Sequence, residues 1–595
     1  MPLPEPGTEL RVKIGGEAGS GIKAAGQTLA RSFVDAGLDV FDLTEYPSLI
    51  RGGHNTYKLR VAPYRVTSHM DKIDVLIALN RETVDLHLDE LVDGGAVIFD
   101  PEQTSTDTWL PDARIRPVPV PLALFAKEAG GPIMANTVAL AAALALVHFP
   151  VEHLNEALRA QFAAKKPEIA EQNVVAAKLG YDYVTEHAPD FWISVSPKTG
   201  APKRLLVDGN EAVGLGAIAA GIGFYAAYPM TPASSLLHFM AAHERDAGIV
   251  VKHTEDEIAA MNMVCGAAFT GTRAMCATSG GGFALMVEAF GMAGVSESAV
   301  VVGMFTRPGP ATGLPTWTEQ SDLRYVIHAA QGEFPRVVMA PGDREDAFVL
   351  AWKAFNLADQ LQTPVVILGD SYLSDNRESI PYYDLDAVTV ERGKFVAEGD
   401  IADHPEALGA DGQYFRYKLT EDGVSVRALP GVSGATQLVN SYEHDEYGWG
   451  SAGEMATVRS AQDEKRMRKM ELARALVPPP ALFGVPPEAA DVSLLVFGTT
   501  KGPAFEAIRW LEPEGVRVAM MQVVTVWPFP AEEVRAFLDA AKTTLIVEGN
   551  LTGQLQGLVR QHCLRDVDHT LHRYDGRPFS PEQIYAKLTE VIAGV

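Results

Sequence analysis

Residues 273–305, RAMCATSGGGFALMVEAFGMAGVSESAVVVGMF, decide the fold class. The apolar run Arg273–Ala277 enters the turn Ser279–Gly282, and a helical pattern follows over Phe283–Val295. A second apolar run, Ala299–Phe305, comes soon after that helix. Two short strands joined through one helix form parallel neighbours in a sheet, so this stretch predicts an α/β fold.

The alternation of strands and helices continues on both sides of this stretch and divides the chain into three modules. The first module begins with a strand at Leu10–Ile14, and its alternation predicts a parallel sheet covered on both faces. The second contains further strands at Phe224–Tyr228 and Val250–His253 and a helix at Asp256–Thr270. The expected divisions are a first module at 1–184, a linker at 185–204, a second module at 205–380, an irregular arm or linker at 381–489 with a polar helix at Ala461–Leu476, and a third module at 490–595.

Length and composition are those of a multidomain globular protein. The chain has 595 residues, of which 47% are hydrophobic and 21% charged, and this length predicts about three to five domains. The formal net charge of −26 repels phosphate, which argues against nucleic acid or an anionic membrane as a partner. The first residues lack the pattern of a signal peptide, and the uncharged stretch 212–240 is interrupted by glycines and prolines. We therefore expect a soluble, cytoplasmic protein.

The three cysteines are Cys265, Cys276 and Cys563, and no two of them are close in sequence. A cubic iron–sulfur cluster usually needs four thiolates, so this chain alone cannot supply a set of cysteine ligands. A framework of disulfides is equally unexpected, which fits a reducing compartment. We expect no metal site in the chain itself.

A glycine-rich turn follows the first strand, with the spacing Gly16-x-x-Gly19-x-Gly21. Glycines let the backbone approach an anion, and the next helix directs its first amides towards the turn. Phosphate binding and an ordinary tight turn both remain open on this evidence. A second basic and glycine-rich segment, Arg51–His54, is expected to be a flexible loop in the same module.

Three polar residues of the second module are candidates for chemistry. Thr231 lies in the turn Tyr228–Pro232 after a predicted strand, where it either contacts a ligand or caps the next helix. Glu257 begins a helix that is apolar or small on every side, so burial is expected to raise its pKa towards the range useful for proton transfer. Arg307 follows the strand Ala299–Phe305, where it either holds a carboxylate or is solvated.

Four segments in this order resemble one family, the 2-oxoacid:ferredoxin oxidoreductases. They are YPMTP at 228–232, EDEIAAMNMVCGAAFTG at 255–271, TSGGGFALM at 278–286 and FTRPGPATGLPT at 305–316. GEAGSGIKAAGQ at 16–27 and EYPSLIRGGHN at 45–55 are similar to the γ-type domain of this family. The resemblance is to the α subunit of two-subunit members, with a γ-type domain, a pyrimidine-binding domain and a transketolase C-terminal-like domain.

The resemblance implies an enzyme that oxidatively decarboxylates a 2-oxo acid on thiamine diphosphate, reduces ferredoxin and forms an acyl-CoA. Glu257 matches the carboxylate that contacts the aminopyrimidine, with Tyr228, Pro229 and Thr231 on the same side of the cofactor. Thr231 also matches a hydroxyl near the substrate, and Arg307 a cation near the carboxylate of the 2-oxo acid. Gly19, Ser20 and Gly21 are implied to contact CoA.

Two absences indicate that this chain is part of a larger enzyme. The GDG…N signature of thiamine diphosphate sites does not occur, and Gly369-Asp370-Ser371 is its nearest approach. Iron–sulfur ligands are also too few. The resemblance implies that a β subunit supplies the diphosphate site, its Mg²⁺ and a [4Fe–4S] cluster, in an assembly of two α and two β subunits.

The fused two-subunit arrangement favours 2-oxoglutarate as the substrate within this family. A dicarboxylate needs a second cation, for which Arg51, Arg324 or a β-subunit residue are candidates. The alternatives are pyruvate, a branched-chain or an aryl 2-oxo acid in the same class of enzyme, or a non-catalytic binding or assembly subunit. A standalone transketolase-like enzyme is disfavoured by the missing diphosphate motif. The sequence leaves the direction of the reaction open.

Overall fold

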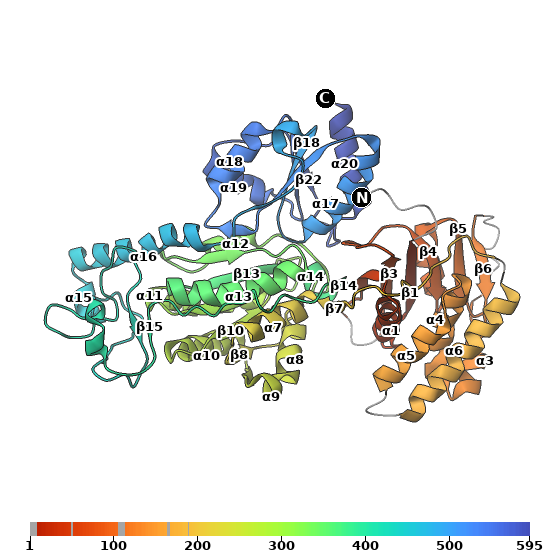
Figure 1. Ribbon diagram of the computed structural model, residues 1–595, viewed down its shortest axis with the longest axis horizontal. Helices are drawn as coiled ribbons and strands as arrows, with labels where there is room; N and C mark the ends of the chain where they lie inside the picture. The colour runs from red at the N-terminus through yellow and green to blue at the C-terminus, as the bar shows by residue number, and fades with distance from the viewer. Residues whose placement is uncertain (1–8, 49–51, 105–113, 163–166, 189, 595) are drawn as a thin grey trace.

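The computed structural model describes residues 9–48, 52–104, 114–162, 167–188 and 190–594. Three α/β bodies and an arm make up the molecule (Figure 1). The N-terminal body lies at one end, the middle body at the centre and the C-terminal body beside the middle one, while the arm extends at the opposite end. The α/β fold class predicted from the sequence is confirmed.

The N-terminal sheet has eight strands in the order β6-β5-β4-β1-β3-β2-β14-β7. Its strands are β1 (Leu10–Glu17), β2 (Asp39–Glu45), β3 (His54–Ala62), β4 (Ile73–Ala78), β5 (Leu91–Phe99), β6 (Arg116–Pro119), β7 (Leu205–Asp208) and β14 (Arg377–Ile380). β1 pairs in parallel with β4, but β3 runs antiparallel to both β1 and β2. The prediction of a parallel sheet is therefore wrong for this half of the sheet.

The error comes from β3, which the sequence analysis did not predict. His54, expected in a flexible loop, is the first residue of this strand and pairs with Glu17. Its alternation of apolar Tyr57, Leu59 and Val61 with charged Lys58 and Arg60 is typical of a strand with two different faces. Arg51 lies outside the described residues.

One face of this sheet packs on helices and carries the apolar core of the N-terminal body (Figure 1). The helices of this body are α1 (Ile22–Asp35), α2 (Arg81–His87), α3 (Leu122–Ala129), α4 (Ala135–Leu146), α5 (Val151–Phe162) and α6 (Pro167–His187). On the other face Val84 of α2 packs with Leu76 of β4 and Phe99 of β5, and charged side chains of β3 form buried ion pairs, such as Arg60 with Glu506 of the C-terminal body at 3.2 Å. Part of the second face is thus covered by polar contacts between bodies rather than by its own helices.

The middle sheet has seven strands in the order β20-β12-β13-β11-β10-β8-β9. These are β8 (Phe224–Ala227), β9 (Val250–His253), β10 (Ala274–Thr278), β11 (Val300–Thr306), β12 (Val337–Met339), β13 (Val365–Asp370) and β20 (Thr525–Trp527). All neighbours are parallel except β20, which runs antiparallel to β12. The helices around it are α7 (Gly209–Ala219), α8 (Ser234–Ala242), α9 (Glu244–Ala247), α10 (Glu257–Phe269), α11 (Gly280–Val295), α12 (Leu323–His328), α13 (Arg344–Leu361) and α14 (Ser371–Asp375).

The C-terminal sheet has five strands in the order β17-β19-β18-β21-β22. They are β17 (Ala481–Gly484), β18 (Val492–Val496), β19 (Val518–Gln522), β21 (Thr544–Glu548) and β22 (His569–His572), with helices α17 (Lys501–Leu511), α18 (Ala531–Ala540), α19 (Gln554–Cys563) and α20 (Pro581–Ala593). Strands are exchanged between bodies, because β7 and β14 complete the N-terminal sheet and β20 completes the middle one. This exchange ties the three bodies together.

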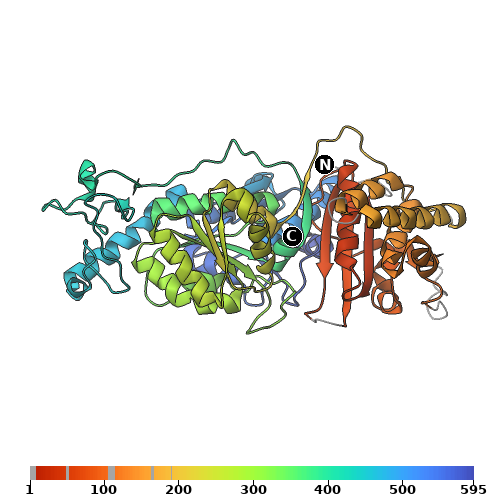
Figure 2. The ribbon, with the colours of Figure 1, turned by 90° about the horizontal axis from the view of Figure 1, so that it is seen from below.

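The arm contains short elements and one long helix (Figure 2). Its elements are β15 (Phe395–Val396), β16 (Arg427–Ala428), α15 (Gly450–Gly453) and α16 (Ala456–Leu476), and α16 begins five residues before the predicted start at Ala461. Tyr414 and its apolar neighbours give the arm a small core of its own. Among the described helices none has both the length and the apolar character to cross a bilayer.

Candidate functional site

The predicted site residues of the middle body lie at one edge of its sheet. Because β8, β10 and β11 are parallel neighbours, the turns that follow them meet at their carboxyl ends. Those turns hold Tyr228, Pro229 and Thr231 after β8 and Arg307 after β11, and Glu257 follows the next strand, β9. Ligands of open parallel sheets bind at this edge.

Glu257 is the first residue of α10 and only 3% of its surface is exposed. Asp256 caps the helix by accepting a hydrogen bond from the amide of Ala259 at 2.8 Å, so the Glu257 side chain is free for another role. Its Oε1 atom is buried and has no hydrogen-bond partner among the described residues. Burial raises the pKa of the Glu257 carboxyl, and the negative charge of Asp256 adds to the rise. A carboxyl group in this state can hold a proton and donate it to a bound ligand.

Gly282 makes room for that carboxyl group. A Cβ atom at this position would lie 2.5 Å from Glu257 Oε1 and 2.0 Å from Thr278 Oγ1. From the sequence, Ser279–Gly282 was predicted only as a turn between a strand and a helix, and this packing role was missed. The available signal was three consecutive glycines in the first turn of a helix, where glycine is otherwise unfavourable.

Arg307 and Thr231 are in contact with each other. The Arg307 Nη1 atom donates a hydrogen bond to the carbonyl oxygen of Thr231 at 2.8 Å. The guanidinium is partly buried, which lowers its pKa, and the described residues offer it no carboxylate partner. It can therefore pair with the carboxylate of a ligand.

The Thr231 hydroxyl does not cap the next helix. α8 begins at Ser234, its N-cap is Ala233, and no side chain makes a capping bond there. The turn is held by Asn210 instead, whose Nδ2 donates to the carbonyl of Pro232 at 2.9 Å and to Ser235 Oγ at 2.7 Å. The alternative left open by the sequence, a capping role for Thr231, is thus wrong.

Asp322 is a residue near this edge that sequence reasoning missed. A Cβ atom on Gly280 would lie 2.6 Å from Asp322 Oδ2, so this carboxyl group faces the first turn of α11. Burial raises the pKa of Asp322 to about 6, and the charge of Glu319 contributes to the rise. Only the structure brings it to the site, because nothing in its sequence neighbourhood distinguishes it from a surface acid.

The glycine-rich turn lies in the N-terminal body rather than at this edge. Gly19 and Gly21 have φ angles of +88° and +83°, which only glycine adopts readily, and Gly21 is the N-cap of α1 and makes no side-chain capping bond. Ser20 Oγ donates to the carbonyl of Glu17 at 2.6 Å, and Asn136 Nδ2 donates to the carbonyl of Ser20 at 2.8 Å. The turn is exposed to solvent and its first helical amides are available to an anion.

Arg324, one candidate for a second substrate cation, does not face the Glu257 edge. A Cβ atom on Gly557 would lie 1.6 Å from its Nη2 atom, so the guanidinium packs on α19 of the C-terminal body. Its interpretation as a substrate contact is therefore wrong in this structure. The other candidate, Arg51, lies outside the described residues.

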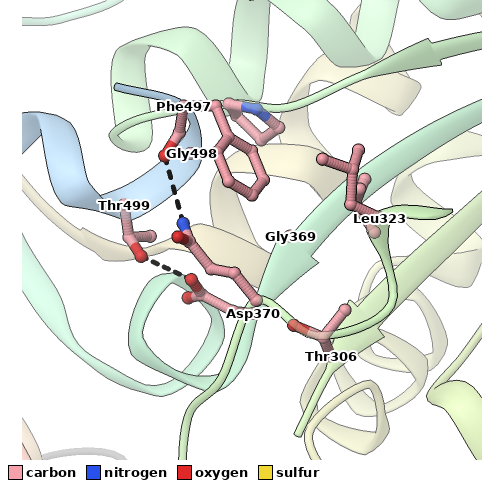
Figure 3. A pocket seen from close by; sticks show the side chains of 10 residues that line it. Thr306, Leu323, Gly369, Asp370, Phe497, Gly498 and Thr499 are labelled. Atoms are coloured by element: carbon pink, nitrogen blue, oxygen red, sulfur yellow. Dashed lines mark hydrogen bonds between the residues drawn. The ribbon is translucent and has the colours of Figure 1, made fainter. Parts of the chain in front are cut away.

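Gly369 and Asp370 of the Gly369-Asp370-Ser371 segment lie where the middle body meets Phe497 and Thr499 of the C-terminal body (Figure 3). Asp370 caps α14 by accepting from the amide of Leu373 at 2.9 Å, and it also accepts a hydrogen bond from Thr499. The cavity beside these residues measures about 10 Å³, which is room for one water molecule and far too small for a diphosphate. Asp370 therefore has a structural role.

Family comparisons cover almost the whole chain in order. Residues 11–183 match the family described as pyruvate ferredoxin/flavodoxin oxidoreductase. Residues 215–462 match pyruvate flavodoxin/ferredoxin oxidoreductase, thiamine diphosphate-binding, and residues 490–584 match pyruvate:ferredoxin oxidoreductase core domain II. The carboxyl edge of the middle sheet, where Glu257 lies, falls inside the second match. The fold and the site therefore define an oxidoreductase of the thiamine-diphosphate-binding class.

The chain belongs to the family of 2-oxoacid:ferredoxin oxidoreductase α subunits. It is 34% identical to subunit alpha of 2-oxoacid:ferredoxin oxidoreductase 2 from Aeropyrum pernix, with 98% of each chain covered. It is 27% identical to the 2-oxoglutarate oxidoreductase subunit KorA of Mycobacterium tuberculosis, covering 98% of this chain and 91% of that one. A solved 2-oxoglutarate:ferredoxin oxidoreductase from Magnetococcus marinus, with 2-oxoglutarate, coenzyme A and succinyl-CoA bound, is 31% identical and covers 98% of this chain and 100% of its own, with a TM-score of 0.90.

Proposed function

We propose that this chain is the α subunit of a 2-oxoglutarate:ferredoxin oxidoreductase in the cytoplasm. The reaction is CoA-dependent oxidative decarboxylation of 2-oxoglutarate to succinyl-CoA and CO₂, or its reductive reverse, with electrons passing to or from ferredoxin. The observation that carries the proposal is the buried, unpartnered Oε1 atom of Glu257 at the carboxyl edge of the middle sheet.

The surroundings of Glu257 fit thiamine diphosphate. A buried carboxyl group with a raised pKa can remain protonated and donate a hydrogen bond to a ring nitrogen of the aminopyrimidine. Tyr228 and Pro229 follow β8 at the same edge of the sheet and are proposed to contact the pyrimidine side of the cofactor. When bound, the cofactor supplies the carbon nucleophile that adds to the 2-oxo group. Glu257 holds the proton that promotes this reactivity.

Arg307 and Thr231 are proposed to position the substrate. Arg307 has no acidic partner in the described ranges, so its remaining N–H groups are available to the carboxylate beside the 2-oxo carbon. Its bond to the carbonyl of Thr231 fixes the distance between the two residues. The Thr231 hydroxyl, which is not needed as a cap, is proposed to donate to the same substrate.

The remainder of the active site is proposed to come from a β subunit. Next to Glu257, the outward faces of α10 and α11 expose Ile258 (47%), Met263 (37%) and Leu285 (49%). Such an apolar face is typical of a protein interface. A β subunit docked there would hold the diphosphate, its Mg²⁺ and a [4Fe–4S] cluster, in an assembly of two α and two β subunits.

The names of relatives support 2-oxoglutarate as the substrate and CoA as the acyl acceptor. The Magnetococcus marinus enzyme was solved with both compounds, and the Mycobacterium tuberculosis relative is a 2-oxoglutarate oxidoreductase subunit. Gly19, Ser20 and Gly21 are proposed to contact a phosphate of CoA at this exposed turn, in which the Ser20 amide donates to the carbonyl of Glu17 at 3.1 Å and the first amides of α1 face the ligand. A second candidate keeps the chemistry with pyruvate, branched-chain or aryl 2-oxo acids, because the Aeropyrum pernix relative is named only for 2-oxoacids.

The substitution Glu257→Gln in the complex co-purified with its β subunit tests the proposal. Glutamine keeps the shape of the side chain but cannot supply the proton, so turnover should fall by about 10²–10⁴-fold while thiamine diphosphate stays bound. Glu255→Gln is the matched control, since Glu255 is exposed two residues earlier. Near-normal turnover of Glu257→Gln would instead favour a non-catalytic binding subunit.

A panel of 2-oxo acids tests the substrate in the same complex. Comparison of kcat/KM for 2-oxoglutarate, pyruvate, and branched-chain and aryl 2-oxo acids should rank 2-oxoglutarate first. If it ranks among the poorest substrates, the second candidate replaces the first.

A further inference from the structure

The distal arm, which we define as residues 398–455, projects beyond the end of the middle body in both views (Figures 1 and 2). Its root is fixed by buried charges. Lys465 and Lys469 of α16 bind the two oxygens of Glu297 at 2.5 and 2.6 Å, and Arg427 binds Asp359 at 2.8 Å. The distal arm is therefore held in one position rather than tethered loosely.

An apolar groove lies between the distal arm and the first turns of α16. It measures about 360 Å³ and is lined mainly by Phe415, Leu419, Tyr447 and Val458. Beside it, Trp449 is 55% exposed, and its ring stacks on Tyr447 with the centroids 6.0 Å apart. Exposed aromatic residues next to an apolar groove are typical anchors of a protein interface.

The charge of the distal arm restricts what can occupy this groove. The distal arm contains eleven Asp and Glu residues and three Lys and Arg residues. Two of the three cations, Arg416 and Arg427, are buried at the root, so acidic side chains far outnumber basic ones on the outer surface even though Asp422 and Glu443 pair with cations from outside the distal arm. A second copy of this chain, with a net charge of −26, would be repelled. The occupant must present an apolar side chain flanked by Lys or Arg.

The distal arm also contacts the helix that carries the face assigned to the β subunit by the proposed function. α11 carries the exposed Leu285 on that face and ends at Val295. The carbonyl of Val295 accepts a hydrogen bond from His444 Nε2 of the distal arm at 3.1 Å. A polypeptide docked along α10 and α11 therefore reaches the distal arm at the end of α11.

We propose that the distal arm is a second docking site for the β subunit, with the groove beside Trp449 receiving an apolar side chain from a basic segment of that subunit. This inference rests on the proposed function for the identity of the partner. What it adds is the location of the docking site, on the distal arm and outside the sheet edge that holds Glu257, and the chemistry of the segment that fills the groove.

The test is the affinity of the full-length chain for its co-purified β subunit, measured by sedimentation on dilution. Tyr442 is a second aromatic residue of the distal arm and is 73% exposed. Trp449→Ala and, separately, Tyr442→Ala should raise the dissociation constant about tenfold or more, and excess β subunit should restore turnover. Glu454→Lys, an exposed charge reversal, should weaken binding and reduce its dependence on salt. Trp192→Ala is the control, an aromatic residue 43% exposed on the linker between the first two bodies.

Each outcome separates the two proposals. If the arm variants bind the β subunit as tightly as the wild type and with the same salt dependence, the docking site is overturned while the proposed function stands. If Trp449→Ala weakens self-association of the chain but not binding of the β subunit, a second copy is the occupant and the inference is also overturned. If the wild-type chain binds no β subunit at all, the proposed function itself fails.

Discussion

Gly282 and Glu257 act as a pair, because one residue leaves the space that the other occupies. The substitution Gly282→Ala places a Cβ atom 2.5 Å from Glu257 Oε1, so the carboxyl group must move. We expect turnover to fall about tenfold or more, since catalysis depends on positions held to within about 1 Å. Gly281→Ala is the control in the same helical turn, where the nearest atoms lie 4.0 Å away, and it should keep turnover. Equal turnover of both variants would contradict the packing role of Gly282.

The raised pKa of Glu257 predicts how stability depends on pH. In the unfolded chain this residue titrates near its ordinary pKa, whereas burial raises the pKa in the folded chain. As pH rises through the interval between these values the unfolded state releases its proton first, so the fold loses stability. Glu257→Gln removes this titration. The free energy of unfolding of the single chain, measured with denaturant, should be equal for the variant and the wild type below the ordinary pKa of glutamate. Above the raised pKa the variant should be the more stable of the two. If the two free energies change with pH in parallel, the pKa of Glu257 is not raised by folding.

Among the elements, α16 depends on one buried carboxylate for its position. Glu297 binds Lys465 and Lys469, and burial lowers the pKa of these lysines to about 7 and about 8. Glu297→Gln leaves both lysines without a counter-charge, so we expect a loss of about 3–5 kcal/mol in the stability of this contact. Lys465→Met keeps the ion pair between Glu297 and Lys469, so this variant should lose less stability than Glu297→Gln. Hydrogen exchange of α16 measures the difference, and unchanged protection in Glu297→Gln would contradict the anchoring role.

The elements that were predicted best from the sequence are those whose local pattern, an apolar run beside a glycine-rich turn, is sufficient to specify a strand or a helix. The turn Ser279–Gly282 and the apolar runs beside it were sufficient for β10, α11 and β11. β3 was missed because the glycines before His54 indicated a loop, although alternation over Tyr57–Val61 favoured a strand. The return of β7 and β14 to the N-terminal sheet could not be predicted, since pairing between distant strands leaves no local signal.

The same limit applies to the site. Glu257, Thr231 and Arg307 could be proposed from their places after predicted strands, because parallel strands bring such residues to one edge. The space left by Gly282 and the position of Asp322 depend on how α11 packs, which periodicity does not specify. Arg324 was a candidate for the second substrate cation because of its place in the sequence of the middle body, but its guanidinium packs on α19 of the C-terminal body.

At the scale of the whole molecule, the apolar face of α10 and α11 predicts dependence on a partner. Leu285 is 49% exposed on this face, so Leu285→Asp should leave the fold of the single chain intact. Its charge would be buried in the proposed interface, and we expect the dissociation constant for the β subunit to rise about tenfold or more. Leu86→Asp, on α2 and 57% exposed, is the control. Equal affinity of the two variants would place the β subunit elsewhere.

The central claim is that Glu257 promotes loss of the proton from the reactive thiazolium carbon of thiamine diphosphate. Exchange of that proton with deuterium, followed by quenched-flow NMR in the assembled complex without substrate, measures this step directly. We predict that Glu257→Gln slows the exchange by about 10²-fold or more while Glu255→Gln leaves it unchanged. An exchange rate in Glu257→Gln equal to that of the wild type, with the cofactor bound, would contradict the account.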